Sequence, residues 1–72
     1  MDNIKRRRKP YTKFKAFLVE NGIKQQEVAK LLDKSKSALN QNINGTGGDF
    51  SLEELRVLAT TYKISIDTFF IN

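Results

Sequence analysis

The polar side chains best suited to specific hydrogen bonding recur at helical spacing from Lys36 to Asn44. At about 100° per residue, Leu39 and Ile43 fall on one side of a helical wheel. The opposite side carries Ser37, Asn40, Gln41 and Asn44. An Asn or Gln amide can form two hydrogen bonds with the edge of adenine, and Asn is a poor helix former, so its clustering needs a reason. The pattern favours a face that reads base edges; the alternative is an ordinary exposed helix face.

Positive charge is concentrated at one end of the chain. The formal net charge is +5, with +6 on residues 1–15, +1 on residues 16–44 and −2 on residues 45–72. Such asymmetry indicates a polyanionic partner. We expect nucleic acid rather than a membrane surface, because the charged stretch contains no amphipathic helix with an apolar face.

Residues 1–9 offer almost nothing to a core, since five consecutive cations follow Ile4. We predict that they form a flexible basic arm that binds phosphates or enters the minor groove. The alternative is a solvated tail that only improves solubility. Two lysines nearer the amide face are also predicted to contact phosphate, with solvated turn residues as the alternative. The candidate phosphate contacts are Arg6, Arg7, Arg8, Lys34 and Lys36.

Composition and length both argue against an enzyme, because a chain this short has little room for a large active-site cleft. The 72 residues include no Cys and no His, which removes thiol nucleophiles, common zinc ligands and the commonest acid-base side chain. The stretch Gly45-Thr46-Gly47-Gly48 lacks the preceding strand and the Gly-Lys-Ser/Thr ending of a phosphate loop, and is interpreted as a plain turn. We expect no enzyme, no cofactor and no metal. No apolar run reaches the length of a membrane span, and no signal peptide is visible.

Apolar spacing predicts five helices and no strand, and therefore an all-α fold. The predicted helices cover residues 10–21, 25–32, 36–44, 51–63 and 65–70. The strongest local signal is the capping-box spacing of Ser51 and Glu54, with Phe50 and Leu55 placed as a hydrophobic staple. These helices form one domain over residues 10–72.

Three bulky apolar residues follow one another near the end of the sequence: Phe69, Phe70 and Ile71. So small a domain has little room to bury all three. We consider them a candidate surface for a homodimer or for another protein partner, and the alternative is that they pack onto the first helix.

Two short helices joined by a turn of about three residues form a helix-turn-helix unit. The ordered set of matching residues comprises Gln25, Glu27, Val28, Ala29, Leu32, Ser35, Ser37, Leu39, Asn44, Gly45, Ser51–Leu55, Leu58, Ala59 and Ile64–Asp67. From Tyr11 to Phe70 the sequence resembles the lambda-repressor-like, Cro-type (XRE) helix-turn-helix family. The resemblance implies a five-helix domain that binds double-stranded DNA as a symmetric dimer. It implies DNA contacts at Ser35, Lys36, Ser37, Asn40, Gln41 and Asn44, and a phosphate contact at Gln25.

Three positions depart from the family pattern. Asp33 occupies a turn position that usually holds Gly, and Lys34 follows where an apolar residue is usual, so we expect a less firmly packed turn. The second apolar anchor of the helix is Ile43, one residue later than usual, with Asn42 in its place. Asn42 is predicted to be a structural hydrogen-bonding residue.

These features predict a cytoplasmic regulator in a bacterial host cell, from a phage or mobile element, that represses transcription by occupying an operator. The alternative is a modulator of the same fold that binds a partner repressor and blocks its DNA surface, which the lack of Arg on the amide face favours. An antitoxin role stays open.

Overall fold

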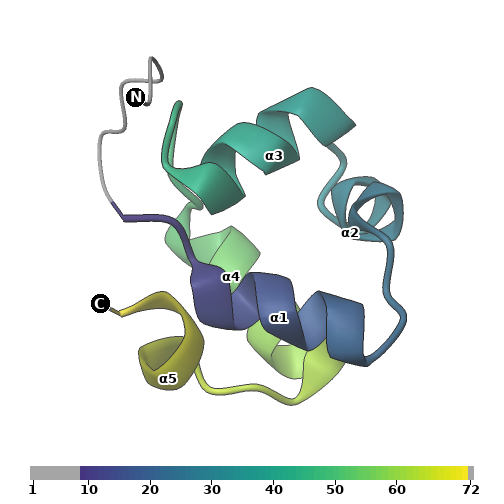
Figure 1. Cartoon of the computed structure of the whole chain (residues 1–72), viewed down its shortest axis with the longest axis vertical. Helices are drawn as coiled ribbons and strands as arrows, with labels where there is room; N and C mark the ends of the chain where they lie inside the picture. The colour runs from purple at the N-terminus through teal and green to yellow at the C-terminus, as the bar shows by residue number, and fades with distance from the viewer. Residues whose placement is uncertain (1–8, 72) are drawn as a thin grey trace.

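Five short helices follow one another between Thr12 and Phe70 (Figure 1). The computed structural model describes residues 9–71, and within that range it contains no strand. The helices are α1 (Thr12–Glu20), α2 (Gln25–Leu31), α3 (Lys36–Asn44), α4 (Leu52–Tyr62) and α5 (Ile66–Phe70). The predicted all-α fold is confirmed, whereas the predicted basic arm, apart from Lys9, lies outside the described residues. No helix in the described part of the chain is long and apolar enough to cross a membrane.

Serine side chains begin three of the helices. The hydroxyl oxygens of Ser35, Ser51 and Ser65 accept hydrogen bonds from backbone N–H groups three residues later, at 3.0, 3.1 and 3.3 Å. At α4, the Glu54 carboxylate also accepts a hydrogen bond from the Ser51 N–H at 2.9 Å, which completes the predicted capping box. A cap of this kind contributes about 1 kcal/mol. These serines therefore determine where α3, α4 and α5 begin.

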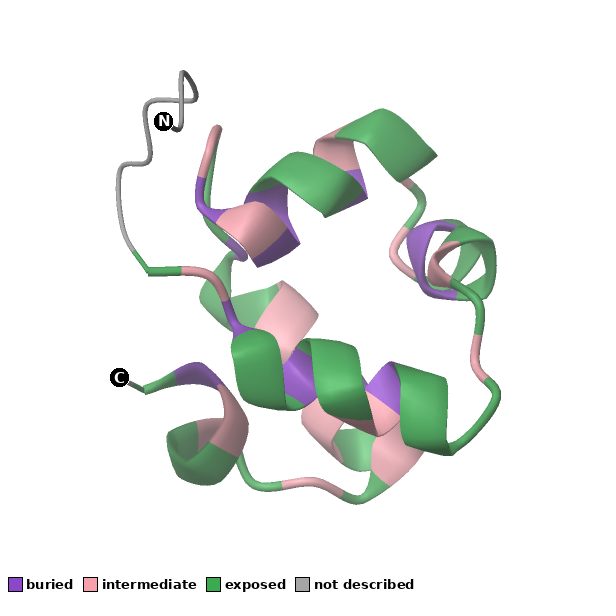
Figure 2. Cartoon of the chain, viewed as in Figure 1, coloured by how far each residue is buried: buried purple, intermediate pink, exposed green. Residues whose placement is uncertain are grey.

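Aromatic rings from the start of α1, the loop before α4 and the end of α5 meet in the core. Figure 2 shows buried residues in α1, α2 and α3 and at the end of α5. The ring of Phe70 lies edge-on to Tyr11, with centroids 5.1 Å apart, and 4.9 Å from the ring of Phe14. Phe50 lies 5.7 Å from Phe70. The other buried apolar residues are Leu18, Val28, Ala29, Leu39, Ile43 and Leu58. All five helices contribute to this core, so none can move away without exposing it.

The last helix packs onto the first. Phe70 is only 4% exposed, and Phe69 is half-buried with its ring edge-on to Phe17 at 5.5 Å. The expectation that Phe70 contacts a partner is therefore corrected, because the core of the monomer already covers its ring. Ile71 differs, since 64% of it remains exposed.

Candidate nucleic-acid interface

The turn between α2 and α3 sets the relative position of these two helices. Ala29 is buried, and its carbonyl oxygen accepts a hydrogen bond from the Lys34 N–H at 3.0 Å. Asp33 adopts the left-handed conformation, with a φ of 56°. Glycine adopts this conformation most readily, and Asp tolerates it better than most residues do. Asp33 therefore adopts the backbone conformation for which glycine is usual at this position of the turn.

One side of α3 is sealed inside the protein. Leu39 and Ile43 are fully buried, and Asn42 beside them is 5% exposed. Ser37, Asn40 and Gln41 are exposed and Asn44 is half-buried, on the other side of the helix. The predicted division of α3 into an apolar anchor and an outward polar face is thus present in the structure.

The ammonium group of Lys34 forms its hydrogen bonds with side chains of the protein. Its ammonium donates hydrogen bonds to Glu54 Oε2 at 2.9 Å and to Asn42 Oδ1, and lies 5.5 Å from the centre of the Phe50 ring. The Lys34 side chain is only 17% exposed. The predicted phosphate contact at Lys34 is therefore corrected, because the Glu54 carboxylate already neutralises its charge within the fold. Lys36 is exposed, and its contact with phosphate stays a prediction.

The same contacts explain the departures in the turn. Asn42 donates a hydrogen bond to the Gly48 carbonyl at 2.7 Å, in addition to accepting one from Lys34. The prediction of a structural role for Asn42 is confirmed by these bonds and by its burial. Lys34, Asn42 and Glu54, which we call the polar cluster, link the turn to α3 and α4.

The charge state of Glu54 follows from this environment. Burial raises the pKa of its carboxyl group, but the Ser51 N–H and the Lys34 ammonium stabilise the carboxylate more strongly. The net result is a pKa below the ordinary value of 4.5. Glu54 is therefore ionised at neutral pH and serves both the cap of α4 and the ion pair with Lys34.

Hydrogen bonds connect the outward face of α3 to both neighbouring helices. Lys15 Nζ donates to Asn44 Oδ1 at 3.1 Å, and Asn44 Nδ2 donates to Asn40 Oδ1 at 3.0 Å. Asn40 Nδ2 in turn donates to Gln25 Oε1 at 3.4 Å. This amide chain, Lys15–Asn44–Asn40–Gln25, brings together three predicted site residues and one that the sequence did not indicate.

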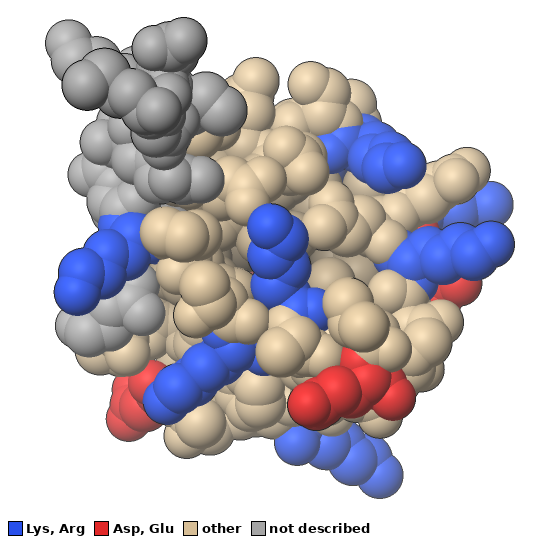
Figure 3. Space-filling view, viewed as in Figure 1, with Lys and Arg blue, Asp and Glu red and all other residues tan. Residues whose placement is uncertain are grey.

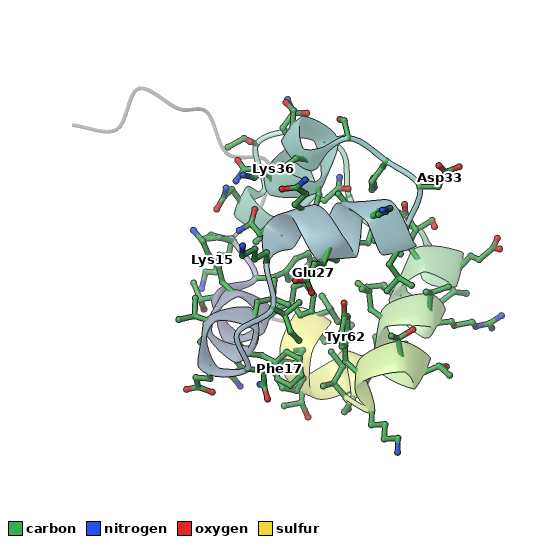
Figure 4. All side chains as sticks on the ribbon, turned by 90° about the vertical axis from the view of Figure 1, so that its right-hand side faces the viewer. Lys15, Phe17, Glu27, Asp33, Lys36 and Tyr62 are labelled. Atoms are coloured by element: carbon green, nitrogen blue, oxygen red, sulfur yellow. The ribbon has the colours of Figure 1, made fainter. Side chains whose placement is uncertain are left out.

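Lys15 was missed because α1 carries two exposed lysines, Lys13 and Lys15, beside its buried Phe14. The pattern of α1 alone does not say which of them faces α3. In the structure, Lys15 and Lys36 lie on the same side of the molecule (Figure 4). A shallow hollow between α1 and the starts of α2 and α3 has Lys15, Lys24, Gln25 and Lys36 among its lining residues.

Among the charged side chains on the face that α1, α2 and α3 present, basic ones prevail over acidic ones. Figure 3 shows Lys and Arg side chains across this face, with the few acidic ones toward its lower and right margins. A face of this charge attracts a polyanion. Within residues 9–71, no group of His, Cys, Asp or Glu side chains could hold a metal ion.

Gln41 lies at the end of the outward face, beside the loop that follows α3. A Cβ added at Gly47 would lie 2.5 Å from Gln41 Oε1 and 2.9 Å from Gln41 Cβ. The loop backbone therefore passes directly against this side chain. Gly45, which ends α3 with a φ of 74°, turns the chain into that loop.

The comparisons with known proteins agree with this geometry. The model of the helix-turn-helix family matches residues 14–69, which include α2, the turn and α3. No curated protein and no solved structure matches the chain. A helix-turn-helix domain of this type implies binding to DNA. The chain belongs to the Cro-type (XRE) helix-turn-helix family.

Proposed function

We propose that this protein is a sequence-specific transcriptional regulator that represses by occupying an operator. The observation that carries the proposal is the outward polar face of α3, anchored from behind by Leu39 and Ile43. A helix mounted in this way can enter the major groove, which is about 12 Å wide. We propose a phage or another mobile element as its source.

Each residue of the face has a proposed role. Asn40, Gln41 and Asn44 reach base edges, while Ser35 and Ser37 at the start of α3 contact either bases or the adjacent phosphates. Lys36 and Gln25 bind phosphate. Arg6, Arg7 and Arg8 add phosphate or minor-groove contacts that do not depend on sequence.

We further propose that the protein binds its operator as a symmetric dimer. α3 has nine residues, and one helix of that length contacts too few base pairs for tight specific binding. Ile71, which is largely exposed beside the half-buried Phe69, supports a dimer surface at the end of α5.

A gel-shift experiment on DNA from the protein's own promoter region tests the proposal. The wild-type protein should form a specific complex that resists an excess of random competitor DNA. Asn40→Ala and Gln41→Ala should each lower the preference for that site over random DNA, by roughly 5-fold to 100-fold. The control is Thr60→Ala, which truncates an exposed residue of α4. Tight specific binding that survives both amide substitutions would reject the proposed base-reading face.

A second candidate function is favoured by the composition of α3, which contains no Arg, the residue that makes the commonest specific contact with guanine. In that case the polar face docks on a partner repressor and blocks its DNA surface. Co-purification with a neighbouring repressor, together with no gel shift on promoter DNA, would support this candidate.

A further inference from the structure

Lys15, at one end of the amide chain, fixes which way the amide groups of that chain are oriented. A lysine ammonium has only donors, so Asn44 must turn its oxygen toward Lys15. Its nitrogen then faces Asn40, which must present oxygen to Asn44 and nitrogen to Gln25. A single cation on α1 thereby determines which way two amides of α3 are oriented.

This orientation leaves a defined set of unused groups. An amide has two donor hydrogens and two acceptor lone pairs. The exposed Asn40 uses one of each within the chain, so one donor and one acceptor remain. At the far end, Gln25 uses its oxygen for Asn40 and keeps its NH2 donors. The Lys15 ammonium uses one of its three donors for Asn44.

These remaining groups match the chemistry of one base. Adenine presents an acceptor, N7, beside a donor, the N6 amino group, whereas guanine presents two acceptors. One free donor and one free acceptor on Asn40 complement adenine and mismatch guanine. The donors of Lys15 and Gln25, at the two ends of the chain, complement phosphate oxygens.

We propose that Lys15 is a positioning residue of the DNA-binding face, which holds the Asn40 amide, through Asn44, in the orientation that reads adenine. The inference rests on the proposed function and adds to it the base recognised and the residue that orients the reader. Lys15 need not touch a base itself, and its ammonium also offers donors to a phosphate.

Selection from a random double-stranded DNA library tests this with the full-length chain. The wild-type protein should enrich sites with adenine at one fixed position. Asn40→Asp replaces the amide by an acceptor-only group of the same shape, so the preference at that position should move from adenine toward cytosine, with adenine disfavoured by about 5-fold to 100-fold. Thermal melting of each variant verifies that it is folded.

The matched variants Lys15→Met and Lys13→Met distinguish the orientation of the Asn40 amide from the general effect of losing a positive charge. Both variants remove one cation from α1, and Lys13 is exposed but takes no part in the amide chain. Both should bind all DNA more weakly. Lys15→Met alone should reduce the selectivity for adenine, because the Asn40 amide is then able to flip.

Three results overturn the inference. If Asn40→Asp selects the same sites as the wild type, Asn40 does not read the base. If Lys15→Met and Lys13→Met select the same sites with equal stringency, Lys15 has no positioning role, while the proposed function survives. If the folded wild-type protein enriches no sequence, the proposed function fails and the inference fails with it.

Discussion

The ammonium of Lys34 lies 2.9 Å from Oε2 of Glu54, and this ion pair joins the turn before α3 to the first turn of α4. Both side chains are largely shielded, with exposures of 17% and 22%. Glu54 also caps α4 through the Ser51 N–H. One carboxylate thus caps α4 and links that helix to the turn before α3.

Removing one partner of this ion pair should destabilise the fold. Lys34→Met leaves the Glu54 carboxylate and the buried Asn42 without their donor, and we expect the free energy of unfolding to fall by about 1–3 kcal/mol. Urea denaturation measures the change. Lys30→Met, which alters an exposed lysine of α2, is the control and should stay within about 0.5 kcal/mol of the wild type. If Lys34→Met matches that control, the polar cluster contributes nothing to stability.

Stability should also depend on pH through Glu54. Its pKa in the folded protein lies below the ordinary value of 4.5, so protonation weakens the folded state relative to the unfolded one. The contribution of Glu54 is present above about pH 4.5 and is lost as the pH falls through the folded pKa. Melting temperatures from pH 7 to pH 2.5 should decline less steeply for Glu54→Gln than for the wild type.

Glu20→Gln provides the control for this titration, because Glu20 is exposed at the end of α1. Its melting curve should keep the acid dependence of the wild type. An equally steep decline in Glu54→Gln would show that other carboxylates account for the acid sensitivity.

The loop after α3 offers a matched pair of glycine substitutions. In Gly47→Ala the new methyl group would lie 2.9 Å from Gln41 Cβ, so the loop or α3 must shift, at a cost of about 1–3 kcal/mol. In Gly48→Ala the nearest atom is Asn42 Nδ2 at 3.8 Å, which is an ordinary contact. Denaturation of both variants checks the difference. Equal stabilities would mean that the loop does not press against Gln41.

The basic arm should act on every DNA sequence alike. Simultaneous Arg6→Ala, Arg7→Ala and Arg8→Ala should weaken specific and random DNA by similar factors. The slope of log affinity against log salt concentration should become shallower by up to about 0.9 per arginine that contacts phosphate. Fluorescence anisotropy over a salt series measures this, with Arg56→Ala on α4 as the control. An unchanged slope would mean that the arm does not contact phosphate and only improves solubility.

A dimer at the end of α5 should be sensitive to Ile71. Ile71→Glu places a charge on an exposed apolar residue and should shift the mass in multi-angle light scattering from dimer to monomer. Val19→Glu makes the same change at a residue of α1 that is 79% exposed, and should leave the dimer intact. If the wild-type protein is a monomer even when bound to its operator, the dimer proposal is wrong.

Most of the fold was predictable from short-range patterns. The spacing of Leu39 and Ile43 located the buried side of α3, and the capping-box spacing located the start of α4 within one residue. These signals are local, because a helix face and a cap involve residues at most four positions apart.

The long-range contacts were not predictable in the same way. Lys34 was assigned to phosphate because its neutralising partner, Glu54, lies 20 residues away in the sequence. The bond from Lys15 to Asn44 spans 29 residues, and nothing in either helix alone indicates it. Phe70 is a further case, because its partners Tyr11 and Phe14 lie at the other end of the domain's sequence, at the start of the first helix. A lysine or a phenylalanine at helical spacing does not reveal which distant side chain it meets.

The place of Phe70 among Tyr11, Phe14 and Phe50 bears on how the protein is made. During translation, α1 to α4 leave the ribosome before the ring that completes their shared core. A nascent chain that has not yet exposed residue 70 lacks the ring against which these three aromatic side chains pack. Folding should therefore wait until residue 70 has left the ribosome, and a nascent chain stalled before that point should be digested readily by proteases.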